Sequence, residues 1–130
     1  MINEEIIMEC GLADGVTAVV RDASRHYFGG YYHVRLLVTA DVALSAAWFG
    51  GAAEYEDAVG RLGSSVRFSR TLEKMAVPRA EVDAVRSTLL DSFETNLRTY
   101  LFRPDFPRRF ALSEYGKARK PVVQRGYAGA

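Results

Sequence analysis

The chain has 130 residues, of which 48% are hydrophobic and 25% are charged, and its formal net charge is +1. These values predict one globular domain of ordinary composition with enough residues for a hydrophobic core. The single cysteine, Cys10, excludes an internal disulfide, and no apolar run is long enough for a transmembrane helix. Because the first ten residues also lack the basic region of a signal peptide, we expect a cytoplasmic protein with no membrane partner.

Charge is unevenly distributed along the chain. Residues 98–130 carry eight lysines and arginines against two acids, whereas residues 1–97 carry nine against fourteen. A basic end of this kind is typical of a segment that contacts nucleic acid or an acidic partner, and equally of a solvated surface.

The N-terminal third alternates strand-like runs with turn signals. A short apolar run over residues 6–10 precedes the turn pair Asp14-Gly15, and a run rich in β-branched residues begins at Val16. Another such run begins at Tyr31. Between these two runs, Gly29-Gly30 predicts a two-residue hairpin turn, since glycine adopts positive φ without steric cost.

Folding the chain about Gly29-Gly30 predicts a definite hairpin register. Phe28 faces Tyr31 in this register, and His26 faces His33. Side chains alternate between the faces of a strand, so we assign the more apolar face to the core. The residues of that face are Val19, Arg21, Ala23, Arg25, Tyr27, Tyr32, Val34, Leu36, Val38 and Ala40.

The middle of the chain contains a loop, a short helix and a further strand. The loop, residues 43–51, holds the only tryptophan and has an apolar tip. A helix over about residues 53–62 follows and stops at Gly63. Alternating hydropathy over residues 64–77 predicts a strand, which Pro78 ends.

The clearest predicted element is an amphipathic helix from Pro78 to about Phe102. Pro104 ends it, residues 105–116 form either a short helix or an edge strand, and residues 117–130 form a basic tail that we expect to be flexible. The apolar positions of the long helix recur at spacings of three and four and are Val82, Val85, Leu89, Phe93, Leu97 and Tyr100.

This order of elements predicts an α+β fold. We expect a mainly antiparallel sheet of three or four strands, packed on one long C-terminal helix and one short helix, in a single domain over residues 1–116. One long helix covers only one face of a sheet. The second face is therefore available to a partner, and we expect a homodimer.

The two histidines are the first candidate site. As cross-strand neighbours, His26 and His33 would hold their β-carbons about 4.5 to 5.5 Å apart, close enough to share a metal ion. Zinc needs three or four ligands, however, and no third ligand is evident. We therefore predict no bound metal and interpret Arg25–His33 as a hairpin tip with stacked aromatic residues.

The sequence contains no motif of a catalytic class. It has no nucleophile elbow, no zinc-protease signature and no glycine-rich phosphate loop. Cys10 lies in an apolar run with no histidine near it in the sequence, which predicts a buried thiol. The sequence therefore favours a protein that is not an enzyme and has no cofactor.

Two functions remain. One is an interaction module that associates with itself through exposed aromatic surface, with Trp48, Phe49, Phe28, Tyr31 and His33 as candidate residues. The alternative is nucleic-acid binding through the basic segment, where cations alternate with aromatic residues that suit phosphate contact and base stacking. Its candidate residues are Arg103, Arg108, Arg109, Lys117, Arg119 and Lys120.

Several segments carry a resemblance to other proteins: "RDASR" with "HVRLLV", then "LGSSVRF", then "NLRTYLFRPDFPRRF". Together they resemble those of small bacterial proteins with no assigned activity, over about Gly15 to Tyr115. The resemblance implies a bacterial, cytoplasmic protein and points to no functional site.

Overall fold

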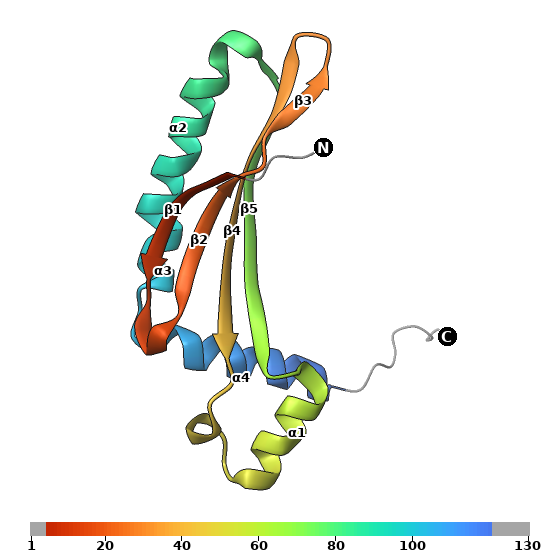
Figure 1. Cartoon of the computed structure of the whole chain (residues 1–130), viewed down its shortest axis with the longest axis vertical. Coiled ribbons are helices and arrows are strands. Elements are labelled where there is room, and N and C mark those ends of the chain that lie inside the picture. The colour runs from red at the N-terminus through yellow and green to blue at the C-terminus, as the bar shows by residue number, and fades with distance from the viewer. Residues whose placement is uncertain (1–4, 121–130) are drawn as a thin grey trace, which may run out of the picture.

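The computed structural model of the chain describes residues 5–120. An antiparallel sheet packs against helices, which confirms the predicted α+β class (Figure 1). The sheet has five strands rather than three or four. They are β1 (Glu5–Gly11), β2 (Thr17–Asp22), β3 (Arg25–Phe28), β4 (Tyr31–Ala43) and β5 (Ser65–Pro78).

Strand β4 is the centre of the sheet. On one side it pairs with β2 and β3 in succession, and on the other side it pairs with β5 over nearly its whole length. β1 pairs with β2 and completes the sheet. β1, with 7 residues, and β5, with 14, are therefore edge strands, and the 4-residue β3, which pairs with β4 alone, is a third.

The hairpin turns at Gly29-Gly30 as predicted, but the predicted register is wrong beyond Phe28. Phe28 pairs with Tyr31, whereas His26 pairs with Tyr32 rather than with His33. A bulge at Tyr27 adds one residue to β3, which shifts every later pair by one position.

This slip of one residue exchanges the two faces of β2, because side chains alternate along a strand. Ala18 and Val20 are fully buried in the core. Val19 and Arg21, which the predicted register placed in the core, lie on the opposite face and are half-buried. On β4 the assignment is correct, and the buried residues include Val34, Leu36, Val38 and Ala40.

Ser24 fills the gap between β2 and β3. Its hydroxyl accepts a hydrogen bond from the backbone N–H of Arg35 at 2.9 Å, and the Ala23 N–H donates to the Arg35 carbonyl at 3.0 Å. The Ser24 hydroxyl thus takes the place of a backbone carbonyl as the acceptor for the Arg35 N–H. The backbone of β4 therefore remains hydrogen-bonded between the end of β2 and the start of β3.

The long helix lies in mid-chain and not at the C-terminus. It comprises a 3₁₀ turn (Arg79–Glu81), α2 (Val82–Ser92), a π-helical turn (Phe93–Leu97) and α3 (Arg98–Leu101). A further helix, α4 (Phe106–Arg119), includes most of the segment for which the sequence left helix or strand open. The short helix is α1 (Ala52–Leu62), which Gly63 ends with a φ of +86°.

The π-helical turn changes which residues of the long helix reach the core. Phe93, Leu97 and Leu101 are buried, whereas Tyr100, a predicted core residue, is 44% exposed. Each residue rotates an α-helix by about 100°, so the one residue that a π turn adds brings Leu101 to the direction expected for Tyr100.

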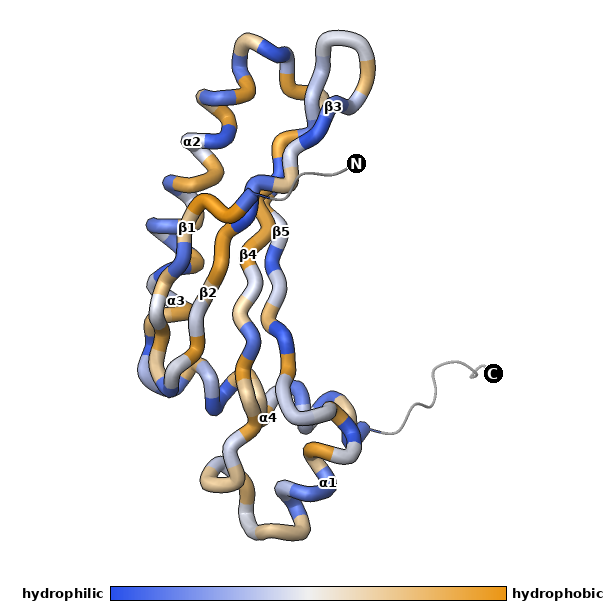
Figure 2. Tube along the Cα trace, viewed as in Figure 1, coloured by the Kyte–Doolittle hydropathy of each residue, from blue (hydrophilic) through white to orange (hydrophobic). Residues whose placement is uncertain are grey.

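The core lies between one face of the sheet and the helices. α2 and α3 run along the sheet, and α4 crosses near one end of it beside α1 (Figure 1). Hydrophilic and hydrophobic residues alternate along β4 and β5, as in strands with one covered face (Figure 2). We call the other side the open face; it carries Val19, Arg21, Arg35, Leu37, Thr39, Asp41, Arg67 and Glu73.

The predictions for the C-terminal end fall partly outside the described residues. α4 continues through Lys117 and Arg119, beyond the predicted domain boundary at 116. Residues 121–130 of the expected tail are not among those that the structure describes. None of the helices between residues 5 and 120 combines the length and the apolar character that crossing a membrane requires.

Candidate functional site

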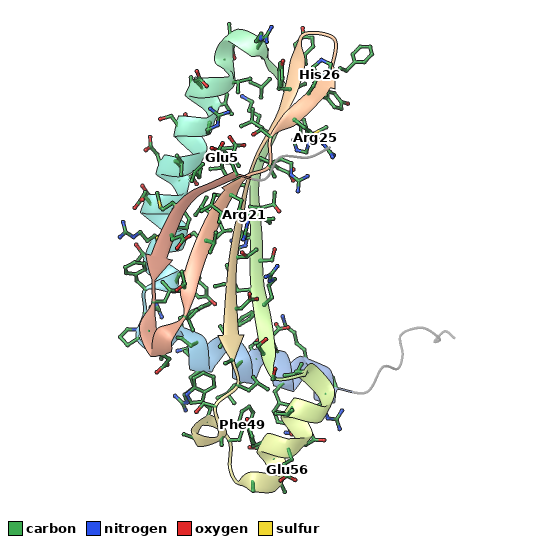
Figure 3. The ribbon with its side chains drawn as sticks, in the orientation of Figure 1. Glu5, Arg21, Arg25, His26, Phe49 and Glu56 are labelled. Carbon is green, nitrogen blue, oxygen red and sulfur yellow. The ribbon has the colours of Figure 1, made fainter. Side chains whose placement is uncertain are left out.

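The predicted aromatic surface is divided between the two ends of the molecule. Phe28 and Tyr31 are 74% and 46% exposed at the hairpin tip. Trp48 and Phe49 are half-buried near α1 and pack against the core, where the Phe49 ring lies 5.5 Å from that of Tyr115. Figure 3 shows the two places, with His26 in the hairpin and Phe49 beside α1. These residues therefore do not form one surface.

The two histidines do not face each other. His26 lies opposite Tyr32, and their rings meet edge-on with centroids 5.3 Å apart. His33 neighbours Tyr32 in the strand and so points to the other face, where its Nε2 lies 2.6 Å from Glu73 Oε1. Within residues 5–120 no group of three or more His, Cys, Asp or Glu side chains is placed to hold a metal ion.

His33 is also not part of an exposed aromatic surface, since it is only 9% exposed. The open face around it is polar and largely satisfied by its own contacts. Arg21 Nη1 donates to Thr39 Oγ1 at 3.1 Å, and Arg67 binds both carboxylate oxygens of Asp41 at 2.8 and 2.9 Å. The hydrogen bond from Arg67 lowers the pKa of Asp41. The exposed aromatic residues of the homodimer prediction, Phe28 and Tyr31, therefore lie at the hairpin tip and not across the middle of this face.

The outer edge of β5 is the first feature that sequence reasoning missed. Within the described chain, β5 pairs with β4 alone, and residues 65–74 pair without a bulge. On the covered face, Phe68 and Leu72 of β5 lie next to Tyr100 of α3. A cavity of about 290 Å³ separates β5 from the long helix here, and its walls include Arg70, Leu72, Leu97 and Tyr100.

The second feature is a cavity of about 380 Å³ between α3, α4 and the start of β5. Four rings line it, from Phe68, Tyr100, Phe106 and Phe110. Its charged residues are Arg103, Asp105, Arg109, Glu114 and Lys117, so the fold brings together three of the six predicted nucleic-acid contacts. The other three, Arg108, Arg119 and Lys120, do not line this cavity.

The cations of the cavity differ in their partners. Arg109 Nη1 lies 3.5 Å from Asp105 Oδ2, and Lys117 Nζ lies 3.1 Å from Glu114 Oε2. Arg103 is exposed and forms no ion pair with any of the described residues. Among the described cations of the cavity, Arg103 can therefore bind an added anion without first breaking an ion pair, whereas Arg109 and Lys117 cannot.

The aromatic wall is fixed by mutual packing. Phe106 and Phe110 stack with centroids 5.8 Å apart and an interplanar angle of 17°. The Phe68 ring meets both of them edge-on, at 5.6 and 5.7 Å. Such contacts hold the rings in place before any ligand arrives.

Part of this cavity was visible in the sequence. The α4 residues that line it follow a helical repeat along one face: Phe106, Arg109, Phe110, Ser113, Glu114 and Lys117. Phe68 is distant in sequence, and no local signal links it to this face.

Comparisons with protein-family models, curated proteins and solved structures find no match for this chain.

Proposed function

We propose that the protein is a small interaction module that forms a homodimer by joining two β5 strands, edge to edge and antiparallel, into one sheet. The observation that carries the proposal is the outer edge of a 14-residue strand, with which no other strand of residues 5–120 pairs. An edge strand offers unpaired N–H and C=O groups, and proteins usually protect it with bulges, a short length or charged side chains. β1 is short and bulged, whereas residues 65–74 of β5 have no bulge and carry only charges, such as Arg70 and Lys74, as protection.

The side chains of β5 are complementary to a second copy in one register. A twofold axis at Arg70 sets Phe68 opposite Leu72 of the other copy on the covered face. The same register sets Arg67 opposite Glu73 on the open face. Apolar residues thus lie opposite apolar residues, which is a favourable cross-strand pair. Arg67 and Glu73 also lie opposite each other, although within one chain they already contact Asp41 and His33.

Arg70 at the axis is the unfavourable element, since it faces its own copy. Each Arg70 guanidinium already lies 5.7 Å from the centroid of its own Phe68 ring, in a cation–π contact. Each Arg70 charge therefore lies beside an aromatic ring of its own chain. In the dimer, two Phe68–Leu72 pairs and two Arg67–Glu73 pairs would flank the twofold axis.

The expected setting of this module is the bacterial cytoplasm. A lone cysteine buried in the core suits a reducing compartment, and the resemblance to small bacterial proteins points the same way.

Sedimentation velocity over a range of protein concentrations tests the dimer. Leu72→Lys places a charge in the interface and should give a monomer. Leu37→Lys is the matched control, because Leu37 is also a half-buried leucine but lies on the open face of central strand β4. A wild-type chain that stays monomeric at every concentration, or a Leu72→Lys variant that still dimerises, would refute the proposal.

Cross-linking tests the register. Arg70→Cys places a cysteine opposite its own copy, at a separation that suits a disulfide, so mild oxidation should link the two chains. Arg67→Cys is the control, since residue 67 faces residue 73 and not itself. Linkage of the second variant alone would show a different register.

Nucleic-acid binding is a second candidate, because three basic residues surround an aromatic cavity. Phosphate contacts release counterions, so this binding should weaken steeply as salt rises, whereas apolar association should not. A mobility-shift assay with single-stranded and duplex DNA and RNA at two salt concentrations separates the two functions.

A further inference from the structure

The cavity between α3, α4 and β5 has the composition of a site for one aromatic anion. Its volume of about 380 Å³ lies in the range of small-ligand sites, which combine apolar walls with a few polar groups. We propose that it binds a single nucleoside phosphate unit, either free or as part of a strand. The inference rests on the second candidate function above and is independent of self-association.

The aromatic wall supplies the surface for the base. Tyr100 is 44% exposed and lines the cavity, whereas Phe106 is buried behind it and supports the wall. The two rings lie 5.4 Å apart and nearly perpendicular. A planar base that packs on Tyr100 gains contact with a ring that is already oriented, and such stacking accepts any base.

The cations supply the site for the phosphate. Arg103 lies in the turn that follows α3, and its backbone N–H donates to the Tyr100 carbonyl at 3.4 Å. Its guanidinium, which has no ion pair among the described residues, can bind two phosphate oxygens at once. Arg109 also lines the cavity, and its contact with Asp105 is long, at 3.5 Å, and exposed, so it can supply a second guanidinium. We therefore place the phosphate between Arg103 and Arg109.

One acid of the cavity, Glu114, sets a preference among bases, while the other, Asp105, pairs with Arg109. Ser113 and Glu114 lie one turn further along α4 than Arg109 and Phe110, so they line the part of the cavity away from the phosphate. A carboxylate accepts hydrogen bonds and repels an anion. The Glu114 carboxylate therefore favours a base that carries an amino group, such as adenine, over one with a carbonyl oxygen in that place.

Titrations followed by backbone amide NMR spectra test the proposal, with AMP, IMP and inorganic phosphate as the probes. We expect saturable AMP binding with shifts at residues of α3 and α4, weaker IMP binding and still weaker phosphate binding. Arg103→Gln removes a charge-assisted contact and should lower AMP affinity about tenfold or more. Tyr100→Leu should lower AMP affinity and leave phosphate binding unchanged.

Arg25→Gln is the matched control, because it removes an exposed arginine of the hairpin and should leave AMP affinity unchanged. The amide spectrum of each variant shows directly whether it is folded. Equal affinity for AMP and phosphate, or no effect of Tyr100→Leu, would overturn the proposal.

A further arm uses a short single-stranded oligonucleotide in the same titration. Binding of AMP and of the strand, both weakened by Arg103→Gln, supports a one-nucleotide site that accepts either source. Binding of the strand without AMP would overturn this inference and leave nucleic-acid binding in place. No response to any probe overturns both, while sedimentation still reports independently on the β5 dimer.

Discussion

Phe93 is the residue whose truncation should most disturb the core. It is 0% exposed and lies at the start of the π-helical turn, in the middle of the long helix. Phe93→Ala removes a fully buried ring, and the lost burial alone is worth about 1.5 to 3 kcal/mol. If about 80 Å³ of the vacated volume stays open, the cavity adds about 2 kcal/mol. The expected loss in the free energy of unfolding is therefore about 3 to 5 kcal/mol.

Urea denaturation followed by Trp48 fluorescence measures this loss, since Trp48 packs against the same core cluster. Leu89→Ala is the internal comparison. Leu89 lies one turn earlier in the same helix but is only half-buried, so its loss should be clearly smaller. A loss below about 1 kcal/mol for Phe93→Ala, or an equal loss at both positions, would refute the assignment of the core face.

Three further outcomes follow from named contacts. Val20→Asp should unfold the protein at far lower temperature than Val19→Asp, because only Val20 is fully buried; equal melting temperatures would contradict the observed β2 register. The pKa of Asp57 is lowered, first by the hydrogen bond from the Tyr115 hydroxyl at 2.7 Å and then by Arg61. This contact stabilises the fold above the ordinary carboxyl pKa, and the contribution is lost as pH falls through the lowered pKa, so Tyr115→Phe should flatten the acid side of a stability–pH curve. Burial raises the pKa of the Cys10 thiol, so it should react with a thiol reagent only at the rate of unfolding; rapid labelling of the native protein would show that the β1 edge opens.

Local chemistry was sufficient to predict where most elements begin and end. Gly29-Gly30 forms the hairpin turn and Gly63 ends α1, because glycine accepts backbone conformations that other residues avoid. Pro78 is the last residue of β5, next to the start of the long helix. These signals depend on a few neighbouring residues, so the sequence alone contains them.

The tertiary structure decided which faces those elements present. A bulge at Tyr27 reversed the faces of β2, and one extra residue in the π-helical turn exchanged Tyr100 for Leu101 in the core. Neither irregularity has a local sequence signal, since each adjusts an element to the packing of distant ones. A bulge or a π turn costs less free energy than burying polar side chains and exposing apolar ones. These irregularities therefore form where they bring apolar side chains to the core.

Tertiary contacts also decided how the candidate sites are assembled. The basic and aromatic residues of α4 were recognisable as a set, but only folding placed Phe68 beside them and left Arg103 without a partner among the described residues. The sequence predicted that Trp48 and Phe49 form the exposed tip of a loop, but in the fold both side chains pack against the hydrophobic core. Composition thus determined which chemistry the chain carries. The position of each group depends on contacts between residues far apart in sequence, and these form only in the folded chain.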